Sequence, residues 1–410
     1  MRPMNLYIGG LISWFGAIGI QTVLFPFLVL TKLDAGAPEL GIAMMALFLP
    51  TMLLILVGGA VADHISGRRI LIFVHFVAGL PSLGLFVAYS TDTLTYPVLI
   101  IYALTMGVMG AFIIPARDSL LTLIASGRVQ KAVMAVTVFQ FGSQILGFGL
   151  ASLEDQVGVG LIFLSQTALL WLGAMLAFRL PDHTPEGGKA PSLSGIAEGF
   201  SEVRQTPRLL APTLIVLCVG VLYFGTSQVV LPIIISNVFD GGSDELATMN
   251  IAMMLGIVFT AMMIGRFGPI ERQGRALILA LGYGTFTMAS FSIAHSFPLF
   301  VAVAFLWGCG GGVAMTMNRT IIQESAPPSH RGRILAIFQM GVLGGAPIGA
   351  FFSGFYVEWL GPQNAVLIPS VLMMVMLLLV CAFTPIWSLA TLAPRAGDTG
   401  KSDMAPGTAD

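Results

Sequence analysis

Long apolar runs recur along the whole chain and alternate with short polar segments. Each run holds about 20 predominantly apolar residues, the length that an α-helix needs to cross the hydrocarbon core of a bilayer. The runs are too long and too evenly apolar for the alternating strands of about ten residues that build a membrane β-barrel. The pattern predicts an all-α membrane protein with twelve transmembrane helices, at residues 7–30, 39–62, 70–90, 95–115, 131–153, 158–178, 209–236, 246–265, 277–294, 297–317, 334–357 and 364–388.

Composition excludes a water-soluble protein. Hydrophobic residues make up 56% of the 410 residues, charged residues only 10%, and the mean hydropathy is +0.91, which leaves too few polar residues to cover a soluble protein of this size. Of the 19 Lys and Arg residues, all but Lys32 fall in the loops and termini on one side of the predicted bundle. Because basic loops stay in the cytoplasm during insertion, we expect both termini to be cytoplasmic.

The second half of the chain repeats the first at a constant shift of 206 residues. The matched pairs include Gly19 with Gly225, Pro26 with Pro232, Asp34 with Asp240, Gly59 with Gly265 and Arg69 with Arg275. Two parallel six-helix repeats place a binding site between the halves and allow alternating access. We therefore expect an N-terminal half at 1–178, a cytoplasmic linker with a short amphipathic helix at 179–208, a C-terminal half at 209–388 and a disordered tail at 389–410.

The turn after the second predicted helix carries a family signature. Gly59 and Asp63 match the pattern G-x-x-x-D-x-x-G-R-[KR], and the basic cluster Gly67-Arg68-Arg69 follows one residue late. With the twelve helices and two repeats, this turn resembles the major facilitator superfamily. Three segments resemble its enterobactin-exporter-like and macrolide-efflux-like branch: 115–121, 200–210 and 318–360. The resemblance implies a secondary transporter of the bacterial inner membrane that works as a monomer, on a small-molecule substrate, without cofactor, metal or nucleic acid.

Charged residues at the cytoplasmic helix ends are the candidates for a gate. The resemblance implies that Asp63 accepts hydrogen bonds from the start of the eleventh helix, near Ile334, because a helix N-terminus attracts carboxylates. Arg68 or Arg69 could pair with Asp118 beside it, or these arginines only direct insertion. The remaining gate candidates are the repeat-related pair Arg117 and Arg319, with Arg331 and Arg333 at the start of helix eleven. For Arg117 and Arg319, salt bridges with Asp118 and Glu324 or contacts with lipid headgroups are the alternative to binding an anionic group of the substrate.

Neutral polar residues are the candidates for the substrate pocket. No Asp or Glu lies in the middle of a predicted span, so a proton carrier and a counter-charge for a cationic substrate are both missing. His75 and His295 lie near opposite edges and are interpreted as structural. The pocket candidates are Gln21, Thr22, Tyr102, Thr105, Tyr223, Ser227, Gln228, Trp307 and Asn318. The alternative is that these side chains hold helices together.

The sequence favours an exporter of a small amphipathic or hydrophobic compound, drug-like or a siderophore, that works by rocker-switch alternating access. Phe148 stands where exporters of the superfamily usually have the proline of a Gly-Pro pair. This difference keeps open an inward or flipping carrier of a lysophospholipid or metabolite. A non-transporting membrane receptor or assembly factor on the same fold is the alternative from another class. No catalytic constellation points to an enzyme.

Overall fold

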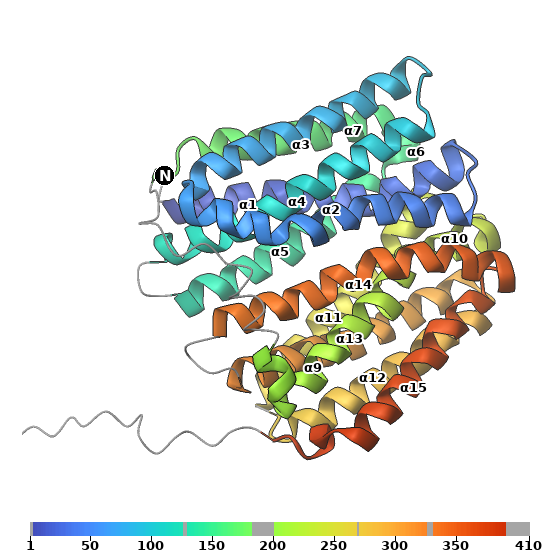
Figure 1. Cartoon of the computed structure of the whole chain (residues 1–410). Coiled ribbons are helices and arrows are strands. Elements are labelled where there is room, and N and C mark those ends of the chain that lie inside the picture. Colours follow the sequence, from blue (N-terminus) through green and yellow to red (C-terminus); the bar gives the residue numbers. More distant parts are fainter. Residues whose placement is uncertain (1–2, 126–128, 183–200, 269, 326–330, 391–410) are drawn as a thin grey trace, which may run out of the picture.

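The computed structural model describes residues 3–125, 129–182, 201–268, 270–325 and 331–390, and these form a helical bundle (Figure 1). Within these residues, eleven helices are long and apolar enough to cross a membrane, and α5 adds a shorter apolar helix at Ala135–Ala151. The predicted all-α membrane fold is therefore confirmed. The amphipathic helix predicted for the linker lies mostly in 183–200 and the predicted tail mostly in 391–410, both outside the described residues; the predicted half boundaries stay predictions.

The N-terminal half contains the first six spans. Its helices are α1 (Pro3–Phe27, continued by the π-helical turn Leu28–Lys32), α2 (Ala37–His64), α3 (Gly67–Ser90), α4 (Tyr96–Ile124), α5 (Val129–Ala151), the short α6 (Glu154–Val157) and α7 (Val159–Ala177). Within this half α2 packs on α4, α3 on α7, and α1 on both α5 and α7. Apolar residues surround most of these helices, as expected for segments that contact lipid on one side and protein on the other.

The C-terminal half repeats this order. Its seventh span combines α9 (Pro207–Cys218), the π-helical turn Val219–Gly225 and α10 (Val230–Phe239); it is followed by α11 (Ser243–Phe267), α12 (Gln273–Ser290), α13 (Phe297–Ser325), α14 (Arg331–Leu360) and α15 (Leu367–Phe383). Pro26 and Pro232 are repeat mates, and each lies near a π-helical turn in the first helix of its half. Proline removes one backbone donor from a helix, and prolines and π-helical turns are both places where helices bend.

Repeat-related glycines let the first and fifth helices of each half cross closely. A Cβ built on Gly19 of α1 would lie 2.9 Å from the Cα of Gly147 in α5. A Cβ built on its repeat mate Gly225 would lie 2.6 Å from the backbone nitrogen of Ala350 in α14. Only glycine allows backbones to approach this closely. The internal repeat seen in the sequence is therefore also a repeat of packing contacts.

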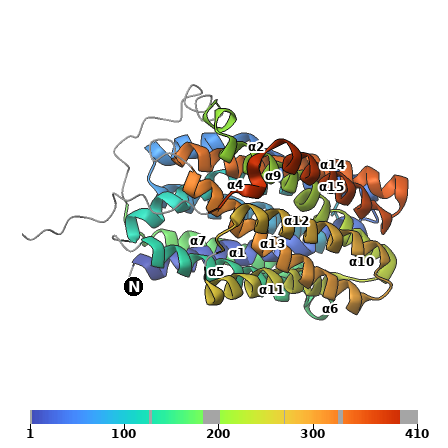
Figure 2. The same ribbon diagram turned by 90° about the horizontal axis from the view of Figure 1, so that it is seen from below.

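The bundle has two ends of different character. We call the end that carries Arg68, Arg69, Arg117 and Arg319 the basic face; α1 and α3 begin there, and α2 and α4 end there. The other end, which carries Lys32 and the short helix α6, is the opposite face. In the view turned by 90° from that of Figure 1, the long helices of both halves run side by side between these ends (Figure 2).

Candidate functional site

The two halves are in close backbone contact at the opposite face, through α2 and α14. A Cβ built on Gly41 of α2 would lie 2.8 Å from the carbonyl oxygen of Ala350, and one built on Gly354 of α14 would lie 2.7 Å from that of Ala37. These distances leave no room for a side chain. Deeper in the interface the helices are joined through side chains, since Met52 of α2 is the neighbour of Gly344.

One apolar core runs through both halves near the opposite face. It connects Leu24 and Leu40 of the N-terminal half with Ile234 and Ala350 of the C-terminal half, all 0% exposed. Across this region the rings of Phe48 and Phe224 lie 5.5 Å apart between centroids. Burial of this apolar surface stabilises the contact between the halves on this side.

Toward the basic face, the described residues of the two halves form separate cores. A second buried cluster contains only C-terminal residues, among them Ala211, Ile215, Leu277, Leu281 and Ile321. A third cluster consists of Val203, Leu209, Ile322, Ile334 and Ile337. The halves are thus joined at one end and packed independently at the other.

Asp63, the predicted latch, lies half-buried at the end of α2. Among the described residues its carboxylate has no hydrogen-bond or ion-pair partner. Ile334 of α14 packs instead against residues of its own half and the linker end. The side chains of Arg331 and Arg333 lie outside the described part, so the latch stays a prediction; in this conformation Asp63 makes no hydrogen bond or ion pair with the described part of α14.

The arginines after Asp63 pair differently from the sequence-based prediction. Arg69 contacts Asp182, with 3.3 Å between Nη2 and Oδ2. This ion pair ties the start of α3 to the segment that follows α7. The described contacts include no pairing of Arg68 or Arg69 with Asp118; the observed partner of Arg69 is 113 residues away in sequence.

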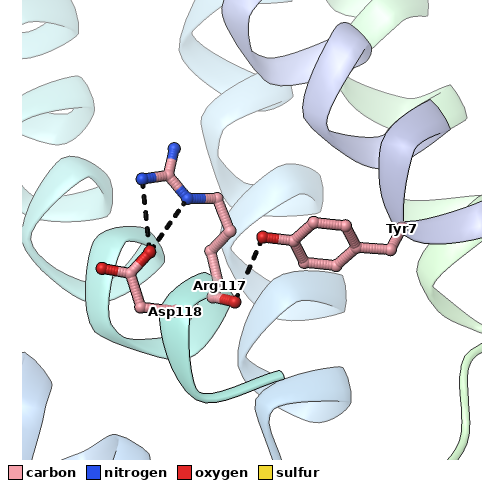
Figure 3. Close-up of polar contacts among 3 residues, drawn as sticks. All are labelled: Tyr7, Arg117 and Asp118. Atoms are coloured by element: carbon pink, nitrogen blue, oxygen red, sulfur yellow. Dashed lines mark hydrogen bonds and ion pairs between the residues drawn. The ribbon is translucent and has the colours of Figure 1, made fainter. Parts of the chain in front are cut away.

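Arg117 is held inside the N-terminal half (Figure 3). Its guanidinium lies 5.3 Å from the ring centroid of Phe15 and 3.4 Å from Oδ1 of Asp118. The hydroxyl of Tyr7 in α1 donates to the Arg117 carbonyl at 3.2 Å. These contacts join the start of α1 to the end of α4.

The repeat mate of Arg117 has a different environment. Arg319 is exposed, and no polar partner for it is found in the described ranges. Glu324, the predicted alternative partner, accepts a hydrogen bond from Gln273 at 3.0 Å. The two arginines are therefore equivalent in sequence but not in contacts, and a role of Arg319 at the mouth of a cleft stays a prediction.

Two of the predicted pocket residues of the N-terminal half meet in a buried network. Tyr102 donates to Oε1 of Gln21 at 3.2 Å. Gln166, which sequence reasoning missed, donates to the Tyr102 hydroxyl at 2.9 Å and to the Ala17 carbonyl at 3.0 Å. Its position in the sixth span was visible in the sequence, but nothing there indicated a partner. All three side chains are buried, so the network joins α1, α4 and α7.

The C-terminal half has a comparable but smaller cluster. The Tyr223 hydroxyl lies 2.7 Å from Oγ1 of Thr285, a residue missed by sequence reasoning, and the Tyr223 ring meets Trp307 edge to face at 5.9 Å. Asn318 donates to the Pro212 carbonyl at 3.3 Å, and its Oδ1 has no partner among the described residues.

The remaining pocket candidates are bonded locally or are only partly buried. Thr22, Thr105 and Ser227 donate to carbonyls three or four residues earlier in their own helices, and Gln228 is partly buried. Their place in a substrate pocket stays a prediction.

Comparison with known proteins decides the family. The model of the Major Facilitator Superfamily matches residues 6–272 and 224–404. The chain belongs to this superfamily of transporters, and it is a multi-pass membrane protein. The two overlapping matches together cover most of the chain, in agreement with its two related halves.

Individual relatives are distant but similar over nearly the whole length. The chain is 25% identical to the multidrug efflux pump Tap of Mycolicibacterium fortuitum over 93% of this chain and 96% of that protein. It is 22% identical to the staphyloferrin A transporter of Staphylococcus aureus over 87% and 88%. The crystal structure of the nucleoside transporter NupG superposes with a TM-score of 0.73 at 15% identity, covering 93% of this chain and 99% of that one, which shows the shared fold.

Proposed function

We propose that this transporter exports a small amphipathic or hydrophobic compound from the cytoplasm across the bacterial inner membrane. The basic face would lie in the cytoplasm, as the distribution of Lys and Arg favours. The observation that carries the proposal is the asymmetric contact between the halves: Gly41 and Gly354 meet at the opposite face, whereas the cores are separate at the basic face. Such a conformation is one of the two that alternating access requires, and it would receive a substrate from the cytoplasm.

The names of the relatives favour this substrate class. Tap is named a multidrug efflux pump, and the other relative is named after the siderophore staphyloferrin A. The polar side chains of the pocket candidates are neutral, and Trp307 and Tyr223 add aromatic surface. Apolar and aromatic walls with a few hydrogen-bonding groups suit an amphipathic organic molecule.

Accumulation of a chemically diverse panel of labelled compounds in cells tests the proposal. Cells would express wild type, Asp63→Asn or the matched variant Asp92→Asn, or carry an empty vector, with and without a protonophore. Asp92 is exposed in the loop after α3 and has a positive φ of 53°, a conformation that asparagine tolerates. Export predicts lower accumulation of some compound in wild type and in Asp92→Asn, and restoration by the protonophore and by Asp63→Asn.

The rival functions have distinct outcomes in the same experiment. Phe148, buried in α5, keeps an inward or flipping carrier as the second candidate, because α5 lacks the proline expected of exporters. Higher accumulation in wild type, including that of lysophospholipid analogues, would replace export by this function. Unchanged accumulation of every compound would favour a receptor or assembly factor.

A further inference from the structure

His75 is a buried histidine in the part of α3 nearer the basic face, with only 2% of its surface exposed. Its Nδ1 lies 2.8 Å from the Leu71 carbonyl, one turn earlier in α3. Its Nε2 lies 3.3 Å from the Gly10 carbonyl of α1. A neutral imidazole carries one N–H, so one of these contacts would set a nitrogen lone pair against a carbonyl oxygen. Only the imidazolium donates to both oxygens.

The neighbouring helices fix the ring in this orientation. A Cβ built on Gly173 of α7 would collide with Cδ2 of His75, so glycine provides the space in which the ring lies. The ring of Trp14 meets it edge to face at 5.6 Å. The imidazole therefore keeps both nitrogens directed at the two carbonyls, and loss of a proton changes a contact between α1 and α3.

A small pocket lies beside His75 on the side of the basic face. Its lining includes His75 and Trp14 in the interior and Tyr7, Arg117 and Leu180 near the helix ends. The titratable groups that line it besides His75 are Tyr7 from α1 and Arg117 from α4; the lining residues of α7 are Gly173 and Ala177, and that of α3 is Leu71. The charge of Arg117 is balanced by Asp118 at 3.4 Å, so the mouth of the pocket does not present an uncompensated cation to a proton.

We propose that His75 is the proton-binding site through which this transporter is coupled to the proton gradient. Nε2 accepts a proton while the transporter is open toward the opposite face and then donates it in the hydrogen bond to the Gly10 carbonyl; in the conformation open toward the basic face, release passes the proton to water on that side and removes that bond. Nδ1 keeps its hydrogen and its bond to Leu71 in both forms. α1 also contacts α10 and α11 of the other half. A bond between α1 and α3 that forms and breaks with the proton therefore changes how firmly one of the helices at the contact between the halves is held.

Ionisable residues inside a membrane are rare and commonly mark proton paths, and the spans of this chain lack central carboxylates. The internal repeat does not duplicate this proton site, because the position equivalent to His75 in the C-terminal half is Leu281. The carbonyl of Leu281 accepts instead from Tyr223 at 3.1 Å. The coupling part of the inference rests on the proposed transport function, whereas protonation of His75 does not.

Nitrogen-15 NMR of histidine-labelled protein in lipid nanodiscs tests the site directly. His64 is the matched control, since its Nδ1 has the same contact one turn back, 2.9 Å from the Ala60 carbonyl, but the residue is exposed and lacks a second carbonyl. Signals are assigned with His75→Gln and His64→Gln. We expect both nitrogens of His75 to be protonated at the acidic end of a titration over about pH 5 to 8, the range in which histidine changes charge, and a single N–H at the alkaline end. A ring that stays neutral throughout overturns the proposal.

Coupling is measured with the neutral fluorescent probe N-phenyl-1-naphthylamine in inverted membrane vesicles, with and without an imposed proton gradient. The gradient is expected to accelerate movement of the probe in wild type and His64→Gln, and to leave the rate within about twofold of the gradient-free rate in His75→Gln. A full response of His75→Gln to the gradient overturns the coupling role. If wild type moves neither this probe nor any compound of the accumulation panel, this result counts against the proposed function, and the nitrogen spectra still decide the proton site.

Discussion

Gly41 of α2 and Gly354 of α14 lie backbone to backbone at the face of the bundle that carries few basic residues. A Cβ on Gly41 would be 3.4 Å from the Gly354 nitrogen and 2.8 Å from the Ala350 carbonyl oxygen. This contact joins the two halves where their apolar core is continuous. Toward the basic face the buried clusters of the C-terminal half contain no described residue of the first six spans, and Asp63 of α2 has no hydrogen-bond or ion-pair partner among the described residues.

Substitution of Gly41 by leucine should force the halves apart at the opposite face. Overpacking of such a contact costs about 1–3 kcal/mol, and every 1.4 kcal/mol is about tenfold in an equilibrium. We expect the transport rate of Gly41→Leu to fall by about tenfold or more at equal expression. The matched control is Gly84→Leu, because a Cβ on Gly84 in α3 meets no atom within 4 Å. Equal rates for the two variants would show that the contact is not needed.

The buried network around Tyr102 distinguishes structural from substrate-binding roles. Tyr102→Phe removes one buried hydrogen-bond partner from each of Gln21 and Gln166, which costs about 1–3 kcal/mol. Unfolding of Tyr102→Phe is expected at a lower temperature than that of wild type, with KM unchanged. Thr105→Val is the control, since Thr105 bonds only to the Ile101 carbonyl of its own helix. A raised KM without loss of stability would place Tyr102 in the substrate pocket instead.

The buried carboxyl group of Glu154 in α6 makes the folded protein less stable as the pH rises. The carboxylate is 5% exposed and lies 3.3 Å from Lys32; burial raises its pKa above the ordinary 4.5, and Lys32 offsets this only in part. A raised pKa means that the folded state binds the proton more tightly, so the cost of the buried charge is absent below pH 4.5 and grows as the pH rises.

Glu154→Gln should therefore be more stable than wild type at neutral pH, with a difference that shrinks on acidification. The melting temperature in nanodiscs between about pH 4.5 and 7.5 measures this, across the range in which a raised carboxyl pKa changes stability. Asp92→Asn, in the exposed loop after α3, serves as control, because Asp92 is not among the groups that shift the pKa of Glu154. A constant difference between Glu154→Gln and wild type across the range would contradict the assignment.

The spans and the repeat could be predicted because their physical causes are visible in single residues. Each helix needs an apolar stretch of fixed length, and repeat mates such as Gly19 and Gly225 have the same packing function in both halves. For this reason eleven of the predicted spans coincide, within the described residues, with helices long enough to cross a membrane, and the twelfth coincides with the shorter apolar part of α5.

The contacts of individual polar residues could not be predicted in the same way. Arg69 pairs with Asp182 because the start of α3 lies beside the end of α7, a proximity that no local pattern encodes. Gln166 contacts Tyr102 through helices distant in sequence. Helices that are apolar on all sides do not reveal which face meets the other half, so sequence alone cannot separate pocket residues from buried ones.

Alternating access is tested most directly by the accessibility of a single cysteine at the interface of the halves. Met52→Cys in α2, which faces Gly344 of α14, is introduced after replacement of Cys218, Cys309 and Cys381 by alanine. Its alkylation by a membrane-impermeant maleimide, added from the basic face, is compared in the Asp63 and Asp63→Asn backgrounds, with Asp92→Asn as control. If Asp63 closes the basic face in the other state, Asp63→Asn accelerates alkylation by about two- to fivefold, as loss of a helix-terminus interaction of about 0.3–1 kcal/mol implies. Equal rates in all backgrounds would contradict a basic face that opens and closes through Asp63.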